Sequence, residues 1–313
     1  MDTTQVTCCI CEKPGTHMLG RRPYCDEHFA LVNKPHPGFW RAALVQIIGM
    51  VVFTAIVAAL AALLPAGGLT GAPLMLACLC LAIVPAAVWL FYFRQQDRLE
   101  PEPKTYILGV FLLALLLTDV IGRRVLLDFF HVEDWITLSS STNLIGSILV
   151  IGFTLEGIKW AAVRFRVYGT SEFDERMDGV VYGTAAGLGV ATMLNLRFIL
   201  ESGGAELGPA VIHVVVAAMA QASFGGITGY FLGEAKFVEE PWWWMPSGLT
   251  LAAVLNGAFL WLLGEVRASG ITVEPWRGLV FGSLVALATF ALLTWLMSRA
   301  LKRTLSPTAP TNL

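Results

Sequence analysis

The chain has 313 residues, of which 56% are hydrophobic and only 14% charged, and its mean hydropathy is +0.68. A soluble globular domain carries charge on about a quarter of its residues, so the composition excludes that class and predicts an integral membrane protein. The formal net charge of −2, without a basic cluster, predicts no nucleic-acid partner.

The first forty residues are polar and rich in cysteine, and they lack the apolar run of a secretion signal. Two pairs of metal-binding side chains occur here: Cys8-x2-Cys11 and Cys25-x2-His28. Two such pairs can close a tetrahedron around zinc. We therefore expect residues 1–35 to form a cytosolic, structural zinc-binding module that holds a cytosolic partner. The other interpretation is a set of unrelated thiols, and His17 is an alternative ligand.

Seven apolar runs reach the roughly twenty residues that a helix needs to cross a bilayer. They are Ala42–Leu64, Ala72–Phe93, Leu144–Val163, Gly179–Leu200, Ala210–Leu232, Trp243–Leu263 and Leu279–Met297. Tyr106–Ile121 is shorter and carries Asp119, and we expect it to cross as well. The fold class predicted is an all-α polytopic membrane protein with about eight transmembrane helices over residues 40–300, followed by a disordered tail at 301–313.

The loops between these runs divide the basic residues unevenly. With a cytoplasmic N-terminus, sixteen Lys and Arg fall on the cytoplasmic side and five on the far side. The excess of positive charge in cytoplasmic loops then predicts that both termini are cytoplasmic, in a bacterial-type cytoplasmic membrane. The stretch "RRVLLDFFHVEDWITLSSS" (123–141) is too polar to cross, and we expect an amphipathic helix in the far interface.

Glycines recur at intervals of four residues in two of the predicted helices. They are Gly179, Gly183 and Gly187, and Gly225, Gly229 and Gly233. Small residues at this spacing let helix backbones approach closely in lipid. The pattern predicts tight helix packing, which an intramembrane site also needs.

Ionisable side chains inside transmembrane helices are costly and usually functional. The predicted spans contain four, with three amides beside them: Asp119, Glu156, Lys159 and His213, and Asn195, Gln221 and Asn256. Glu156 and Lys159 are three residues apart and share a helix face. Position alone favours a structural ion pair near the cytoplasmic interface over a functional site.

Four motifs, taken in chain order, resemble the PrsW-type intramembrane proteases, which are related in fold to the CAAX prenyl-proteases. They are "QQDRLEPEPK" (95–104), "EGIK" (156–159), "FDERMDGVVYGTAAGLGVATMLN" (173–195) and "FGGITGYFLG" (224–233). The resemblance covers about residues 94–260. It implies a hydrolytic site of glutamates and histidines, the groups that hold a metal or activate water.

This sequence departs from the family pattern at most of those positions. The resemblance places Leu155 and Leu194 where glutamates are expected, and Gln221 and Asn256 where histidines are expected. Glu156, Lys159 and Asn195 match the pattern. The resemblance therefore implies a remnant site that holds no metal, because amides are not bases and leucine cannot bind a metal. The residues of this remnant site are Glu156, Lys159, Asn195, Gln221 and Asn256.

Three interpretations remain, and the sequence leaves open whether the chain is an enzyme. The first is a pseudoprotease that binds a transmembrane peptide or a membrane-protein partner. The second is an active intramembrane metalloprotease with an altered ligand set, such as Glu156, His213 and Asp119. The third is a membrane scaffold or transporter-like protein whose zinc module recruits a partner.

Overall fold

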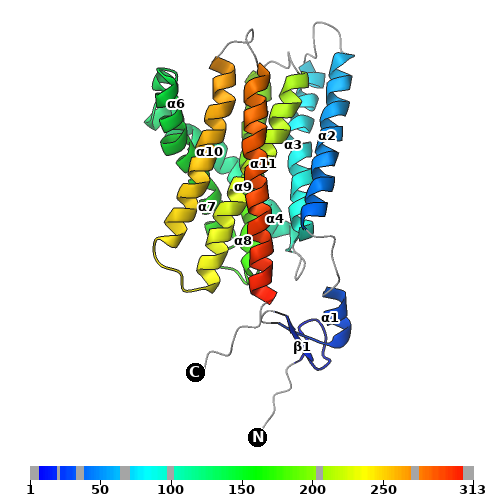
Figure 1. Ribbon diagram of the computed structural model, residues 1–313. Helices are drawn as coiled ribbons and strands as arrows, with labels where there is room; N and C mark the ends of the chain where they lie inside the picture. Colours follow the sequence, from blue (N-terminus) through cyan, green and yellow to red (C-terminus); the bar gives the residue numbers. More distant parts are fainter. Residues whose placement is uncertain are drawn as a thin grey trace.

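The computed structural model describes residues 7–19, 22–32, 39–63, 71–96, 102–201, 207–268 and 275–305. Within these ranges, eight helices are long and apolar enough to cross a membrane, as the sequence predicts. They stand side by side in one bundle, with a small N-terminal module at one end, which we call the module end (Figure 1). The first transmembrane helix begins and the last one finishes at the module end.

The bundle is built from helices that in two cases continue as π-helices. Their bounds are α2 (Phe39–Ala62), α3 (Gly71–Gln96), α4 (Lys104–Leu117) with η1 (Thr118–Gly122) and η2 (Arg124–Phe129), α5 (Val132–Trp135), α6 (Ser140–Gly146) with η3 (Ser147–Gly152) and α7 (Phe153–Arg166), α8 (Arg176–Glu201), α9 (Leu207–Phe237), α10 (Trp244–Ala268) and α11 (Pro275–Leu305). The N-terminal module contains β1 (His17–Leu19), β2 (Arg22–Tyr24) and α1 (Asp26–Val32), with the two strands antiparallel.

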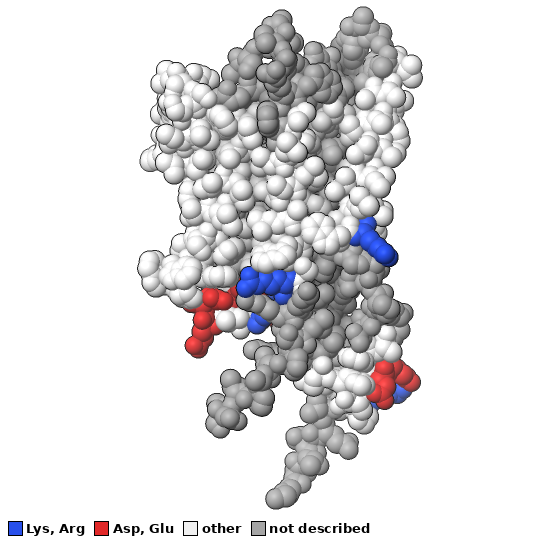
Figure 2. Space-filling view, viewed as in Figure 1, with Lys and Arg blue, Asp and Glu red and all other residues white. Residues whose placement is uncertain are grey.

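Helices α8 and α9 form the centre of the bundle. In each, 83% of the most apolar 18-residue stretch is buried inside the protein, whereas the value for α2 is 11%. The outer helices therefore present apolar side chains to lipid, while the central pair is enclosed by protein. Figure 2 shows that, among the described residues on one face, charged side chains gather toward the module end.

The glycines at four-residue spacing bring α8 and α9 into backbone contact. A Cβ atom added to Gly179 or Gly183 would overlap the carbonyl oxygen of Gly229 or Gly225, respectively. A Cβ atom on Gly187 would overlap the carbonyl oxygen of Gln221. Only glycine permits so close an approach, and the contact fixes Gln221 against α8.

A second close contact joins η3 to α10. A Cβ atom on Gly152 would overlap the carbonyl oxygen of Ala253, and one on Gly257 would come within 2.5 Å of the carbonyl oxygen of Ser147. Single-turn π-helical segments often occur beside functional sites. Here the contact places the start of α7 next to the middle of α10.

Two expectations at the ends of elements are wrong. Residues 123–141 do not form a separate interfacial helix, because Arg124–Phe129 continues the α4 span, which runs from Lys104 to Phe129, and Ser140 begins the next span. The intervening residues contain only the four-residue α5. In the predicted disordered tail, residues 301–305 belong to α11, and 306–313 lie outside the described residues.

Candidate functional site

A cluster of polar side chains lies in the middle of the bundle, enclosed by apolar residues. Glu156 and Lys159 come from α7, Gln221 and Thr228 from α9, and Asn256 from α10, and each is 2% exposed or less. Buried polar groups are costly unless they are hydrogen-bonded, so their partners decide what the cluster can do.

The carboxylate of Glu156 accepts three hydrogen bonds. Lys159 donates from Nζ to Oε1 at 2.5 Å, and Asn256 donates from Nδ2 to the same oxygen at 2.8 Å. Thr228 donates from Oγ1 to Oε2 at 2.9 Å. The ammonium of Lys159 also lies 5.5 Å from the centre of the Phe224 ring. The charge of Glu156 is therefore balanced by a lysine and bound by two neutral donors.

The two amides form a pair of their own. Gln221 donates from Nε2 to Oδ1 of Asn256 at 2.8 Å, and Asn256 donates back to Oε1 of Gln221 at 3.3 Å. A continuous chain of hydrogen bonds thus links α7, α10 and α9.

Thr228 is the member of this network that was not expected from the sequence. It stands seven residues, or two helical turns, after Gln221 on α9, and therefore on the same face. That spacing was the available signal, although threonine is common enough in transmembrane helices that the signal is weak.

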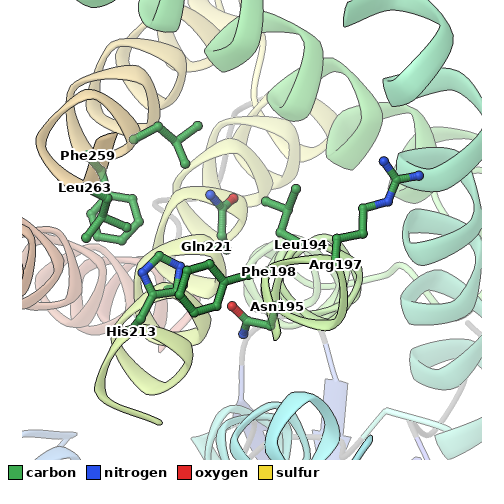
Figure 3. A pocket seen from close by; sticks show the side chains of 10 residues that line it. Leu194, Asn195, Arg197, Phe198, His213, Gln221, Phe259 and Leu263 are labelled. Carbon is green, nitrogen blue, oxygen red and sulfur yellow. The ribbon is translucent and has the colours of Figure 1, made fainter. Parts of the chain in front are cut away.

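Asn195 is the one candidate residue outside the network. Its Nδ2 donates to the backbone oxygen of Val214 at 3.1 Å. Its Oδ1 is buried and has no hydrogen-bond partner among the described residues. Asn195 and Gln221 nevertheless line the same cavity of about 280 Å³ (Figure 3). The structure thus bonds four of the five candidates to one another and places the fifth beside them.

The cluster lies well inside the bundle. Gln221 stands near the middle of the 31-residue α9, and Asn256 near the middle of the 25-residue α10. Glu156 and Lys159 precede the end of their span, Arg166, by ten and seven residues, so both lie nearer that end than the other. The location of the cluster toward the cytoplasmic side stays a prediction.

Asp119 and His213, the alternative acids and bases, have other contacts. Asp119 on η1 pairs with Arg197 on α8, and the His213 ring stacks on Phe198 with centroids 3.9 Å apart. In the part of the chain that the structure describes, only the N-terminal module brings three or more His, Cys, Asp or Glu side chains close enough to share a metal.

The membrane cluster does not fit a transition metal. Its donor set is one carboxylate, two amides and a threonine hydroxyl, and the carboxylate is already bonded to an ammonium group. Transition metals favour imidazole, thiolate or several carboxylates. Leu155 and Leu194, the positions at which the resemblance implies glutamates, offer no ligand atom.

The N-terminal module does fit a metal. The ligand atoms of Cys8, Cys11, Cys25 and His28 all lie within 4.8 Å of one another. The Cys11 and Cys25 sulfurs are 3.8 Å apart, and Nδ1 of His28 lies 3.5, 3.4 and 3.3 Å from the sulfurs of Cys8, Cys11 and Cys25. Zinc bonds of about 2.3 Å to sulfur and about 2.0 Å to nitrogen give tetrahedron edges of about this length. A disulfide would need about 2.05 Å.

Neighbouring groups support this donor set. Burial raises the pKa of the Cys8 thiol, but hydrogen bonds to the backbone of Cys25, Ile10 and Cys11 and to His28 outweigh it and hold the pKa at about 6. A thiolate, the form that binds metal, is thereby favoured at Cys8. At Cys11 a backbone hydrogen bond from Lys13 lowers the pKa, but burial and the Cys8 and Cys25 sulfurs outweigh it, so that pKa is raised. His17 is not one of the four, because its Nε2 lies 2.7 Å from Oδ1 of Asp26. Hydrogen bonds from Thr16 and His17 lower the pKa of Asp26.

The motif at residues 95–104 contributes a structural contact and no side chain of the buried cluster. Glu102 is buried and accepts a hydrogen bond from the Tyr182 hydroxyl of α8. Lys236 of α9 donates to the backbone oxygens of Tyr168 and Phe173 at 2.7 and 2.5 Å. These contacts tie the loops at the module end to the central helices.

Comparison with known proteins agrees with this architecture. Residues 102–293 match the family described as PrsW family intramembrane metalloprotease. Protease PrsW of Geobacillus kaustophilus is 30% identical over 182 residues, covering 58% of this chain and 77% of that protein. Protease PrsW of Bacillus subtilis is 28% identical over 192 residues, covering 60% and 84%.

Protease PrsW of Oceanobacillus iheyensis is 31% identical over 215 residues, covering 66% of this chain and 92% of that protein. No solved structure matches the chain. The family match includes α4 to α10 and most of α11, and it therefore contains the whole buried cluster, whereas the N-terminal module and α2 and α3 precede it. The chain belongs to the PrsW family of intramembrane metalloproteases.

Proposed function

We propose that the membrane domain is a PrsW-family site that has lost peptide hydrolysis and instead binds a membrane-embedded segment of another protein. The observation that carries the proposal is the bonding of Glu156. Its carboxylate is held by Lys159, Asn256 and Thr228, and the residues around it are amides and leucines. A carboxylate can accept about four hydrogen bonds, and Glu156 already accepts three, one of them from an ammonium group, while a metal needs more ligands than this cluster offers. Among the described residues, the cluster therefore supplies one largely occupied carboxylate and no set of metal ligands.

Metal analysis of the purified full-length protein tests the first half of the proposal. We expect about one metal per chain in the parent and none in the Cys11→Ser/Cys25→Ser variant. In that variant background, Leu155→Glu, Leu194→Glu, Gln221→His and Asn256→His together should create a new metal site. A metal that survives Cys11→Ser/Cys25→Ser and is lost with Glu156→Gln would overturn the proposal.

A cleavage assay tests the second half. The parent, reconstituted in liposomes with a fluorogenic transmembrane peptide, should leave the peptide intact, and Glu156→Gln should change nothing. Cleavage by the parent that Glu156→Gln abolishes would show an active protease with an altered site. Solute flux through the same liposomes would instead favour the transporter-like interpretation.

We propose further that the N-terminal module holds one structural zinc ion through Cys8, Cys11, Cys25 and His28. The distances among the four ligand atoms and the lowered pKa of Cys8 support this, and so does size, since a module this small needs metal to stabilise its fold. With all four positions filled by protein, no site remains for substrate, so the ion stabilises a surface for a cytosolic partner.

The zinc content of the full-length protein measures this directly. Cys8→Ser should abolish stoichiometric zinc, and Cys9→Ser, an exposed cysteine next to it, should retain it. Equal zinc in both variants, or iron in place of zinc in the parent, would contradict the assignment.

A further inference from the structure

A groove of about 400 Å³ lies between α2 and α11, with residues of α9 as its floor. Thr54 and Ser283 contribute hydroxyl groups to a lining that is otherwise apolar. Val51 of α2 and Leu287 of α11 line the groove and are 62% and 40% exposed, so it opens on the outer surface of the bundle, which faces lipid. Among the described residues, the groove shares no lining residue with the buried polar cluster.

The dimensions of the groove fit one hydrocarbon chain. Its lining residues on α2 extend from Ile47 to Ala58, a step of eleven residues or about 16 Å along the helix. The volume divided by that length gives a width of about 5 Å. Carbon atoms in contact lie about 4 Å apart, so the groove holds a single row of methylene groups. A transmembrane helix, about 10–12 Å across, does not enter it.

The length of the groove also matches a lipid of one leaflet. The hydrocarbon core of a bilayer is about 30 Å thick, so the acyl chains of one leaflet extend over about 15 Å. Arg41 precedes Ile47, the first lining residue of α2, by six residues or about 9 Å. The headgroup region beside the core is about 5–7 Å thick. The guanidinium group of Arg41 therefore lies at headgroup level when the groove lies in the hydrocarbon core.

Both helices that border the groove carry an exposed arginine toward the module end. Arg41 precedes the lining residue Ala55 by fourteen residues, or about four turns, and lies on the same face of α2. Arg299 belongs to the row of every fourth residue on α11 that contains Leu287. Its guanidinium carbon lies 5.5 Å from the centre of the Trp295 ring, which holds the charge at the surface. Figure 2 shows Lys and Arg side chains toward this end of the bundle.

We propose that this groove binds an anionic phospholipid, with one acyl chain between α2 and α11 and the phosphate beside Arg41 and Arg299. Guanidinium groups bind phosphate oxygens through paired, charge-assisted hydrogen bonds. A zwitterionic headgroup carries a cation next to its phosphate, which two arginines would repel, whereas phosphatidylglycerol carries the phosphate charge alone. The site goes beyond the proposed function, and it does not depend on whether the buried cluster hydrolyses peptides.

Photo-crosslinking tests the proposal on the full-length protein in phosphatidylcholine liposomes. Two probes, phosphatidylglycerol and phosphatidylcholine, carry the same diazirine midway along one acyl chain, and each is added at the same trace level. Mass spectrometry of peptides locates the adducts. We expect adducts at the groove residues Val51 and Met219 to exceed those at Leu251 and Val254, which are exposed on α10 outside the groove. With that reference, the phosphatidylglycerol probe should label the groove at least about tenfold more, since each arginine contributes about fivefold.

Paired variants separate the headgroup contact from the acyl-chain contact. Arg41→Gln/Arg299→Gln should abolish the preference for phosphatidylglycerol. Arg123→Gln/Arg124→Gln removes the same charge at the other end of the bundle and should preserve it. Ala58→Phe fills the groove and should reduce groove labelling by both probes. Ile56→Phe enlarges an exposed residue of the same helix that does not line the groove, and it should leave the labelling unchanged.

Two results would overturn the proposal. Equal groove labelling by the two probes would mean that Arg41 and Arg299 do not select the headgroup. Labelling of Val51 and Met219 no stronger than that of Leu251 and Val254 would mean that the groove holds no acyl chain. Both comparisons use the unmodified protein, so they remain decisive even where a variant fails to fold.

Discussion

Glu156 and Lys159 show what a single buried ion pair requires in a membrane protein. Their side chains are 0% and 1% exposed, and their separation is 2.5 Å. Removing two charges from water costs several kcal/mol for each ion, and the pair is stable only where other hydrogen bonds satisfy the remaining lone pairs. Asn256 and Thr228 supply those bonds to the carboxylate. The amide network is thus part of what makes the charge tolerable.

Lys159→Met should destabilise the protein more than the double substitution Glu156→Gln/Lys159→Met. The single change leaves Glu156 buried without its counter-ion, at a cost of about 3–5 kcal/mol, whereas the double change removes both charges. Unfolding midpoints in detergent measure the difference. Equal loss in the single and the double variant would mean that the pair contributes only through packing.

At the same scale, the sequence indicated which residue types matter but not how they bond. The motif order predicted that Glu156, Lys159, Gln221 and Asn256 meet, and they do so in one network. Asn195 bonds instead to the backbone of α9, and Thr228 was not predicted. The direction of an amide side chain depends on sub-ångström packing between helices, which no pattern along one chain encodes.

The helices themselves were largely predictable, because each must bury or expose its apolar surface over a fixed length. Eight spans follow from hydropathy, and the α8–α9 contact follows from glycine spacing. The π-helical turns could not be predicted from either pattern. Residues 123–129 continue a helix in spite of two arginines, because η1 and η2 extend α4 beyond its apolar part. A change in helical pitch leaves no signature in composition.

Gly187→Ala should destabilise the bundle, because the added methyl group would overlap the Gln221 carbonyl oxygen on α9. Overpacking of this kind costs about 1–3 kcal/mol. Gly157→Ala is the matched control, since nothing lies within 4 Å of a Cβ atom at that position of α7. There the higher helix propensity of alanine should leave stability unchanged or raise it by up to about 1 kcal/mol. The unfolding midpoints of the two variants, measured in one detergent, test this difference. Equal midpoints would contradict it.

The whole molecule has an even number of candidate spans among its described residues, and α2 begins at the end of the bundle where α11 finishes. The distribution of Lys and Arg then predicts which membrane face that module end occupies. The charged side chains seen in Figure 2 gather at the same end. A cytoplasmic location would place the cysteine module in a reducing compartment, where free thiols persist as ligands.

Thiol labelling of whole cells tests this orientation. In a background without the exposed Cys9 and Cys80, Ser171→Cys lies in the loop after α7, at the module end, and should react with an impermeant maleimide only after the cells are opened. Ser141→Cys, at the other end of the same span, should react in intact cells. Both positions are exposed in the structure. The reverse pattern would place both termini outside.

The glycine contact between α8 and α9 has a consequence for how such a protein changes over generations. Where two backbones touch directly, no side-chain volume separates them, so the distance between the helices does not depend on which residues face the neighbouring site. Ligands can be exchanged for amides or leucines while the framework keeps its dimensions. In a bundle built this way, a few substitutions can remove the catalytic ligands of a site without changing how the helices pack.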